Sequence, residues 1–440
     1  MASTQLTRTQ SAGNPDVWTL SMWVKRSSLG GNQGLLGTAG GWQDGTGMSI
    51  IFNSSAQINI YNPSQGGGGG NYNVSTSVFR DTNAWYHLVF RADSTQSTQA
   101  DRLKVYVNGV QDTTINTGNY PTQNTNFNNM NTNGQTMIFG GASATNTDNS
   151  FDGLISHVHF SDGYSYDAST FGETDATTGE WKIKTDPTFT LGTNGFTILQ
   201  DGNSITDQSG NSNNFTVGGG TLTKTEDCPS NVFPTLNPLL THAAHGYSLT
   251  YGLGNNKITF NEPSTWPYTT STIAGINGKF YAEFKVDAVG SEASIGVIAS
   301  DTVNVNQTSG GLDDYLGKET DSIGYFNDGR IYNNNSQGQT GLTSFTSGTI
   351  VGVAMDLDNN TVQFYNNGST VGNTVSISAD KFYHFGVSGY NSTQISCNFG
   401  NGYFGTTAVS SAGTNASGIG IFEFDVPTNY RALSTKGLNL

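Results

Sequence analysis

Strict alternation of apolar and polar residues in short segments is the feature that most constrains the fold of this 440-residue chain. In residues 17–25, every second side chain is a large apolar one: Trp18, Leu20, Met22 and Val24. A period of two indicates a β-strand with one face on a core and the other toward solvent. The same alternation recurs in residues 85–91, 103–107 and 279–286. We therefore expect an all-β protein.

The turn residues between these segments agree with that prediction. Glycine occupies 57 positions, while charged residues make up only 12% of the chain and aromatic residues 11%. Disordered chains usually combine low hydrophobicity with high charge, and this chain lacks the charge. Asn108-Gly109 directly follows an alternating segment and predicts a type I′ hairpin. The length predicts two or three domains.

Charge and cysteine content exclude several classes of protein. The formal net charge is −15, from 18 basic and 33 acidic residues, and no Lys/Arg cluster suits nucleic acid. Two cysteines cannot build a disulfide framework, and Cys397 alternates with Ile395 and Phe399, so we expect it to face a core. Residues 1–10 lack the apolar region of a signal peptide, and no apolar stretch reaches membrane-spanning length. We expect synthesis in a cytoplasm without membrane insertion.

Four segments of the first half carry a family resemblance. They are WTLSMWVKRSS (18–28), AWYHLVFRAD (84–93), LKVYVNGV (103–110) and FDGLISHVHFSDGYS (151–165). In this order they resemble the strands of laminin-G-like, pentraxin-related lectin/glucanase jelly rolls. The resemblance covers about the first 170 residues and implies a concanavalin-like β-sandwich.

Five segments of the second half resemble a SPRY (B30.2) domain. They are GKFYAEFKV (278–286), SIGYFNDGRIY (322–332), VGVAMDLDNNTVQFYNNG (351–368), YHFGVSGY (383–390) and ISCNFGNGYFG (395–405). The resemblance implies a second β-sandwich of the same jelly-roll type, in tandem with the first. We expect four regions: a first domain at 1–180, an extension with a proline-containing linker at 181–244, a SPRY-like domain at 245–405, and a C-terminal tail at 406–440.

The linker CPSNVFPTLNPL (228–239) and the tail VPTNYRAL (426–433), combined with these two domains, resemble structural proteins of tailed phages, especially marine ones. This resemblance implies a virion protein made in the host cytoplasm, in contact with other virion proteins and present as a homo-oligomer or in many copies. The expected function is non-enzymatic adhesion to a host-surface glycan or protein, by a tail fibre or another receptor-binding appendage. Two alternatives are an architectural head-decoration or fibre protein without a host ligand and a glycan-degrading enzyme.

The resemblance to lectin/glucanase jelly rolls raises the possibility of catalytic carboxylates, because these folds include glycoside hydrolases with the pattern Glu-x-Asp-x-x-Glu, or one residue longer. Glu173 and Asp175 begin this pattern, but the third position falls on Thr178 or Gly179. Glu180 comes too late. Since retaining enzymes need two carboxyl groups about 5 Å apart, we expect no catalytic site.

Metal ligands are sparse as well. His157 and His159 lie on one face of a predicted strand, where a solvated pair is favoured over a complete zinc site with a third ligand from elsewhere. Asp148, Asp152 and Asp162 stand in loops that bind calcium in the resembled lectins. Calcium takes 6–8 oxygen ligands, and turn-capping by these aspartates is favoured over calcium binding. No cofactor is expected, with calcium left as the alternative.

Binding surfaces remain, built from aromatic residues at loops and strand ends. Amides and hydroxyls pair with sugar hydroxyls, and aromatic rings stack on the pyranose face. SPRY-like domains bind protein segments through such loops, so a protein ligand is equally open. The alternative for each residue is an ordinary rim or core aromatic. The candidate binding residues are Trp42, Tyr61 and Tyr72 in the first domain and Tyr315, Tyr325 and Tyr332 in the second.

Overall fold

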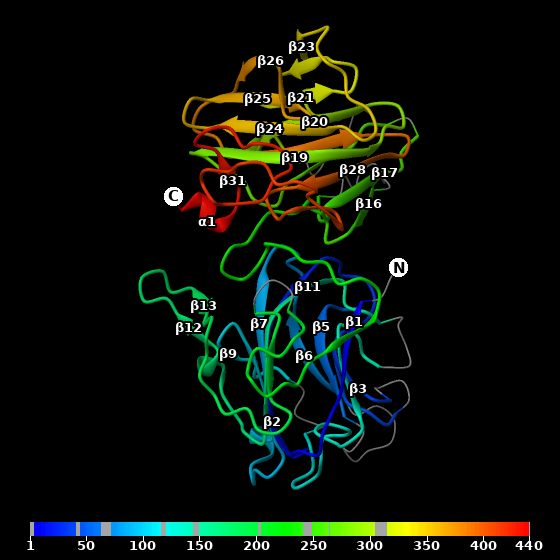
Figure 1. Cartoon of the computed structure of the whole chain (residues 1–440), viewed down its shortest axis with the longest axis vertical. Helices are drawn as coiled ribbons and strands as arrows, with labels where there is room; N and C mark the ends of the chain where they lie inside the picture. Colours follow the sequence, from blue (N-terminus) through cyan, green and yellow to red (C-terminus); the bar gives the residue numbers. More distant parts are fainter. Residues whose placement is uncertain are drawn as a thin grey trace. The chain divides into compact units, whose positions relative to one another are not determined.

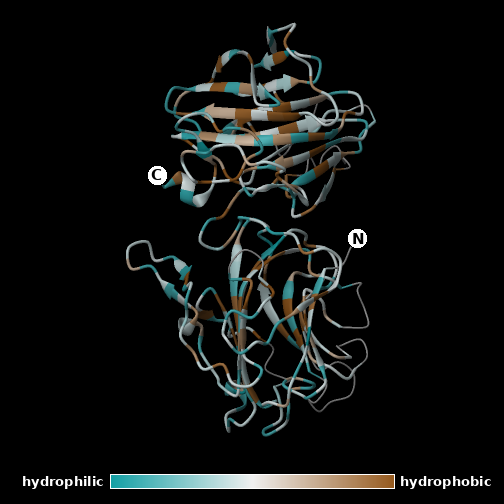
Figure 2. Cartoon of the chain, viewed as in Figure 1, coloured by the Kyte–Doolittle hydropathy of each residue, from teal (hydrophilic) through white to brown (hydrophobic). Residues whose placement is uncertain are grey.

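A computed structural model describes residues 4–40, 45–62, 72–115, 120–143, 149–200, 204–240, 249–263, 265–303 and 315–439. The chain divides into two compact units, Met1–Lys224 and Thr225–Leu440, both built from strands (Figure 1). In Figure 2 hydrophobic and hydrophilic residues interleave along the strands, as alternation predicts. The predicted all-β fold is confirmed. Within these ranges, no helix has the length and apolar character needed to cross a membrane.

The first unit is a sandwich of two antiparallel sheets. Its seven-stranded sheet has the order β15-β1-β10-β3-β4-β5-β6, and its six-stranded sheet has the order β14-β11-β2-β7-β8-β9. The first sheet comprises β1 (Gln5–Thr9), β3 (Gln33–Thr38), β4 (Ser49–Phe52), β5 (Gln57–Tyr61), β6 (Tyr72–Val78), β10 (Thr136–Phe139) and β15 (Thr216–Gly219). The second comprises β2 (Val17–Arg26), β7 (Trp85–Asp93), β8 (Leu103–Val107), β9 (Val110–Gln111), β11 (Gly153–Asp162) and β14 (Phe196–Ile198). A short 3₁₀ turn, η1 (Gln99–Asp101), joins β7 to β8.

The core of this unit is formed by the residues predicted to face inward. Trp18, Leu20, Met22 and Val24 of β2 are all fully buried and belong to one apolar cluster. The predicted type I′ hairpin is also confirmed, because both turn residues have positive φ, 47° at Asn108 and 83° at Gly109.

The opposite face of β2 is buried too, so the prediction of a half-buried strand is wrong. Residues 164–190 pass over this face with η3 (Ala168–Thr170), β12 (Gly172–Thr174) and β13 (Trp181–Ile183). The Thr19 hydroxyl donates to the carbonyl of Tyr164 at 2.9 Å, and Ser161 donates to the carbonyl of Thr190 at 2.6 Å. A second apolar cluster forms under this cover, around Phe171. Polar side chains that alternation assigns to solvent are therefore enclosed.

The second unit is also a sandwich of two sheets. The eight-stranded sheet has the order β16-β17-β28-β19-β24-β25-β26, with β31 pairing beside β19, and the six-stranded sheet has the order β18-β27-β20-β21-β22-β23. The first comprises β16 (Leu249–Gly252), β17 (Lys257–Phe260), β19 (Lys279–Ala288), β24 (Ile350–Asp356), β25 (Thr361–Asn366), β26 (Ser369–Ser376), β28 (Thr393–Asn398) and β31 (Arg431–Ala432). The second comprises β18 (Tyr268–Thr270), β20 (Ala293–Ala299), β21 (Ser322–Phe326), β22 (Ile331–Asn333), β23 (Ser336–Gln339) and β27 (Tyr383–Gly389). The remaining elements are η4 (Ser300–Thr302), β29 (Tyr403–Phe404), β30 (Thr407–Ala408) and α1 (Thr435–Leu438). Cys397 is fully buried in the core, as expected.

The predicted extension at 181–244 is shared between the two units. Its first part supplies β13, β14 and β15 to the first unit, and the second unit begins at Thr225. Within the second unit, the linker and the tail pair with each other: Thr435 donates its backbone N–H to Val232, 3.0 Å away, and its hydroxyl accepts from the Val232 N–H at 2.9 Å. Figure 1 shows the red C-terminal segment against β19, where β31 pairs with it. The tail is thus an integral part of the second sandwich.

Candidate functional site

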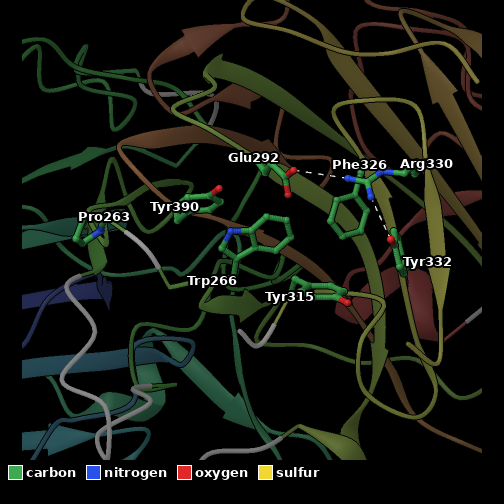
Figure 3. Close-up of a pocket in the computed structure, with 8 residues that line it drawn as sticks. All are labelled: Pro263, Trp266, Glu292, Tyr315, Phe326, Arg330, Tyr332 and Tyr390. Carbon is green, nitrogen blue, oxygen red and sulfur yellow. Dashed lines mark hydrogen bonds and ion pairs between the residues drawn. The ribbon is translucent and has the colours of Figure 1, made fainter. Parts of the chain in front are cut away.

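The candidate site is a surface pocket of about 520 Å³ in the second unit (Figure 3). A volume of this size suits a small molecule or a single residue of a larger ligand. Antiparallel pairing brings the start of β20 beside the ends of β21 and β27, since Ala293 opposes Gly389 and Ser294 opposes Phe326. The lining residues stand at these strand ends and in the adjoining loops: Pro263, Trp266, Glu292, Tyr315, Phe326, Arg330, Tyr332 and Tyr390.

A tight hairpin between β21 and β22 places Arg330 at the pocket. Phe326 and Arg330 close a three-residue loop, in which the Phe326 N–H donates to the Arg330 carbonyl at 2.8 Å. Gly329 adopts φ +87°, the left-handed residue typical of such loops. A Cβ on Gly329 would lie 2.3 Å from the carbonyl oxygen of Leu342, so no other residue fits without a shift. Glycine at this position therefore fixes the direction in which the Arg330 side chain leaves the loop.

Five aromatic rings form one connected group. Trp266 lies in the centre of Figure 3, with ring centroids 5.0 Å from Tyr315, 5.5 Å from Phe326 and 5.1 Å from Tyr390. Tyr332 joins through Phe326, at 5.0 Å. Phe326 is buried, whereas the other four rings are partly exposed. Accessible ring surface around a buried support is the arrangement expected of an aromatic binding platform.

Charged groups hold the Arg330 guanidinium against these rings. Its carbon lies 5.7 Å from the Phe326 centroid and 5.4 Å from the Tyr332 centroid, and its Nη1 donates to the Tyr332 hydroxyl at 3.1 Å. Nη2 lies 3.6 Å from Glu292 Oε1, and Nε forms a close ion pair with Asp328 that lacks hydrogen-bond geometry. Burial lowers the pKa of Arg330, but Asp328, Tyr332 and Glu292 raise it above its ordinary value. The guanidinium is therefore permanently charged and held in one orientation.

Two of the three candidate residues predicted in the second unit line the pocket, Tyr315 and Tyr332. Tyr325 does not, and its prediction as an accessible aromatic is wrong. Its side chain is fully buried, its hydroxyl donates to the Thr343 carbonyl, and its ring packs on Phe345 and Phe364. The neighbouring residue on a strand points to the opposite face, which is why Phe326 reaches the pocket and Tyr325 does not.

Of the three candidates of the first unit, the structure places Tyr61 and Tyr72 opposite each other on neighbouring strands. Trp42 lies outside the described residues, as does the side chain of Tyr72, which begins β6. Tyr61 ends β5 and is partly exposed. Its backbone pairs with Tyr72.

Sequence reasoning missed six residues of the pocket. Two of them are Pro263 and Phe326, and the other four are Trp266, Glu292, Arg330 and Tyr390. Each of these four stands within two residues of a strand end, next to a turn. This position next to a turn is the sequence signal that could have identified them as site residues. All four lie outside the segments that alternation assigns to strands. Their convergence depends on the pairing of strands separated by up to about a hundred residues, which periodicity does not reveal.

The histidine pair is buried, so the expected solvated pair is wrong. His157 and His159 expose only 7% and 2% of their surface, because residues 164–190 cover this face. His159 Nδ1 lies 3.0 Å from the Thr197 hydroxyl, and its ring stacks on Phe171. Burial lowers the pKa of His159 to about 3, helped by the nearby His157. His159 is therefore a neutral packing group at neutral pH.

The two carboxylates that begin the glycoside hydrolase pattern, Glu173 and Asp175, both form ion pairs with Lys182. Lys182 Nζ lies 3.4 Å from Glu173 and 3.2 Å from Asp175, and all three side chains have substantial exposure. The backbone N–H groups of Thr178 and Thr177, followed by Lys182, lower the pKa of Asp175 to about 2. An ionised, lysine-paired carboxylate is not poised to donate a proton.

The calcium alternative has no support from the aspartates that are described. Asp162 is a structural cap: one carboxylate oxygen accepts the backbone N–H of Asn14 at 2.8 Å and the other that of Asn194 at 2.9 Å. Asp152 is exposed, and Asp148 lies outside the described residues. Among the residues that the structure describes, no group of three or more His, Cys, Asp or Glu side chains could hold a metal ion.

Comparison with known proteins identifies both domains. Residues 2–169 match the family model of the concanavalin A-like lectin/glucanases superfamily, and residues 279–402 match that of the SPRY domain. None of the curated proteins compared with the chain matches it.

Several solved structures also match the chain at low identity. The SPRY domain of human HERC1 is 17% identical, covers 32% of this chain and 87% of its own, and has a TM-score of 0.26. Another human SPRY domain is 19% identical, with coverages of 34% and 96% and a TM-score of 0.27. Stonustoxin is 20% identical, with coverages of 39% and 27% and a TM-score of 0.29. On the two family matches and the sheet topology, the chain carries a concanavalin A-like domain followed in tandem by a SPRY domain, both folded as β-sandwiches.

Proposed function

We propose that this chain is a non-enzymatic surface protein of a phage virion that adheres to the host, and that the aromatic pocket of its SPRY domain is the ligand site. The observation that carries the adhesive role is the platform of partly exposed rings around Trp266, flanked by the fixed Glu292–Arg330 pair. Such a site supplies apolar contact area and oriented polar groups without a group poised for proton transfer.

The virion assignment is supported by the sequence of the linker and of the tail. These segments resemble those of tailed-phage structural proteins, and in the second unit they pack together through Val232 and Thr435. A virion would present many copies of the chain, which raises the avidity of a weak site by about 10²–10⁴-fold. The partners in this proposal are other virion proteins and a host-surface ligand.

Adsorption to cells tests the adhesive role. The labelled full chain is incubated with a panel of marine bacterial strains, and bound label is compared for the wild type, for the double variant Glu292→Gln/Arg330→Lys, and for Glu173→Gln. We expect at least one strain to retain the wild type and Glu173→Gln, and to lose the double variant. Glu173 is a matched control because it is an exposed glutamate of the other domain.

Two results would contradict the proposal. Equal adsorption of the wild type and the double variant would show that the pocket takes no part in adhesion. Absence of adsorption to every strain, combined with antibody labelling that places the chain inside the virion lattice, would favour the architectural alternative.

A further inference from the structure

We propose that the pocket is selective for a neutral pyranose sugar, whose apolar face stacks on Trp266 while adjacent hydroxyls bridge Glu292 and Arg330. The inference rests on the proposed adhesive function of the same pocket and deepens it by naming the chemical class of the ligand. Four properties of the site lead to this class: its charge, the Glu292–Arg330 distance, its ring surface and the pairing of its strands.

The charges of the pocket disfavour ionic ligands. Arg330 faces two carboxylates, Glu292 and Asp328, so the three groups sum to one negative charge. An acidic sugar or a phosphate would meet an excess of negative charge. A cationic ligand would enter beside the guanidinium of Arg330, which lies over Phe326 and Tyr332, and would be repelled by its positive charge. A neutral ligand meets neither obstacle.

The distance between Glu292 and Arg330 suits hydroxyl groups. Nη2 and Oε1 are 3.6 Å apart, which is longer than a direct hydrogen bond. A hydroxyl that lies beside both atoms can accept from the guanidinium and donate to the carboxylate at the same time. Such a hydroxyl is polarised from both sides, which strengthens both hydrogen bonds. Adjacent hydroxyls on a sugar ring present this chemistry repeatedly.

The rings supply a surface for the carbon face of a sugar. The plane of Tyr390 is tilted by 35° against that of Trp266 with centroids 5.1 Å apart, and both residues keep part of their surface accessible to a ligand. Tyr315 meets Trp266 at 75° and closes one side of it. Figure 3 shows Trp266 between these two tyrosines. The pocket is open to solvent, and its volume of about 520 Å³ suits a small ligand.

Three strands beneath the pocket, β20, β21 and β27, offer no free edge to an extended peptide. β20, β21 and β27 are interior strands, each hydrogen-bonded on both sides. At the rim, Asn327 donates its backbone N–H to the Ala293 carbonyl at 3.0 Å, and its side-chain oxygen accepts the Ala293 N–H at 2.9 Å. Peptides that bind by strand addition need free main-chain groups. Side chains therefore make the contacts with a ligand at this site, as they do in sugar binding.

Titration of the full chain with defined ligands tests the inference. The probes are the methyl pyranosides of glucose, galactose, mannose and N-acetylglucosamine, compared with N-acetylneuraminic acid, choline and a proline-rich peptide. Calorimetry should detect saturable binding of at least one neutral pyranoside and of none of the other probes. Glu292→Gln and Arg330→Lys should each weaken that binding about tenfold or more, whereas Glu173→Gln should leave it unchanged.

The outcomes separate this inference from the proposed function. If cells retain the chain through the pocket but no neutral pyranoside binds up to tens of millimolar, the ligand class is wrong and adhesion stands. Saturable binding of the anionic sugar, choline or the peptide with the same dependence on Glu292 and Arg330 would also overturn the ligand class. If a pyranoside binds in the pocket but no cell retains the chain, the ligand class stands and adhesion is wrong. Unchanged far-ultraviolet dichroism of both conservative variants confirms that they fold.

Discussion

The buried carboxylate of Glu283 accepts a hydrogen bond from the backbone N–H of Phe424 at 2.9 Å, across 141 residues of sequence. The hydroxyl of Tyr281 donates to the same oxygen, Oε1, at 3.3 Å, and the other oxygen, Oε2, accepts from the N–H of Glu423 at 2.7 Å. Side chains of the linker and the tail, Phe233 and Phe422 among them, form an apolar cluster around Tyr281. A single side chain of β19 thus anchors the C-terminal segment.

Removal of this anchor should loosen the C-terminal segment. Glu283→Ala leaves two backbone N–H groups without their acceptor, which we expect to cost about 3 kcal/mol. Hydrogen exchange in peptides covering 419–433 should accelerate strongly, while peptides of the first unit keep their protection. Glu180→Gln, at an exposed position of the first unit, is the control and should change neither.

The same carboxyl group should make stability depend on pH. Burial raises the pKa of Glu283 to about 7 from an ordinary value of 4.5, despite its hydrogen bonds. The folded state therefore favours the protonated form, so this contribution is fully present below pH 4.5 and is lost as pH rises to 7. We expect the stability difference between the wild type and Glu283→Gln to shift by about 3 kcal/mol between pH 4.5 and 8, in favour of Gln at high pH. A pH-independent difference, measured by urea denaturation, would contradict this assignment.

The first unit should show the opposite dependence. His87 is fully buried between the rings of Trp23 and Trp181, and burial lowers its pKa to about 3. Trp181 Nε1 donates to His87 Nδ1 at 2.9 Å, so Nε2 carries the proton and donates to Ser21. Because the folded-state pKa of His87 lies below the ordinary value of 6.5, its contribution to stability is fully present above pH 6.5. The free energy of unfolding should fall by about 2 kcal/mol between pH 6.5 and pH 5. His87→Gln should reduce this loss in urea denaturation followed at several pH values, and an unchanged slope would argue against a neutral buried ring.

Variants of two tyrosines should distinguish effects on stability from effects on ligand binding in the second unit. Tyr325→Phe removes a buried hydroxyl that donates to the Thr343 carbonyl, so we expect a loss of about 1 kcal/mol of stability and normal ligand binding. Tyr332→Phe removes the acceptor of Arg330 Nη1 at the pocket and should weaken binding with little effect on stability. Thermal denaturation and calorimetry on both variants check this reciprocal pattern, and weaker binding by Tyr325→Phe would contradict it.

Gly329 offers a backbone test of the pocket. Gly329→Ala places a Cβ 2.3 Å from the carbonyl oxygen of Leu342 at a positive φ. We expect a loss of about 1–3 kcal/mol and a displaced Arg330, with weaker ligand binding. Gly341→Ala is a matched control, since φ is +66° there but nothing lies within 4 Å of the added Cβ. Its stability loss should be smaller and its binding normal.

The local parts of this architecture were predictable from sequence, and the covering segments were not. The Asn108-Gly109 hairpin and the inward face of β2 follow from nearest neighbours and a period of two. Alternation assigns Glu283 to solvent, because nothing near it in sequence indicates that the tail covers it. The burial of His159 under residues 164–190 has the same cause.

The pocket shows the same limit. Tyr315 and Tyr332 were predictable as aromatics next to turns, but Trp266 and Glu292 depend on which strand ends meet. The prediction for Tyr325 was wrong although Tyr325 lies two residues after the buried Ile323, on the same face of the strand. Strict alternation therefore predicts that Tyr325 faces the core.

Competition for cell binding tests the central claim, adhesion through the pocket, most directly. The labelled full chain is bound to a strain that retains it, and the neutral pyranoside that binds most tightly in calorimetry is added in increasing amounts. We predict that retention falls with the occupancy of the pocket, down to the level of the Glu292→Gln/Arg330→Lys variant. Retention of the wild type while the pocket is saturated with sugar would contradict the claim.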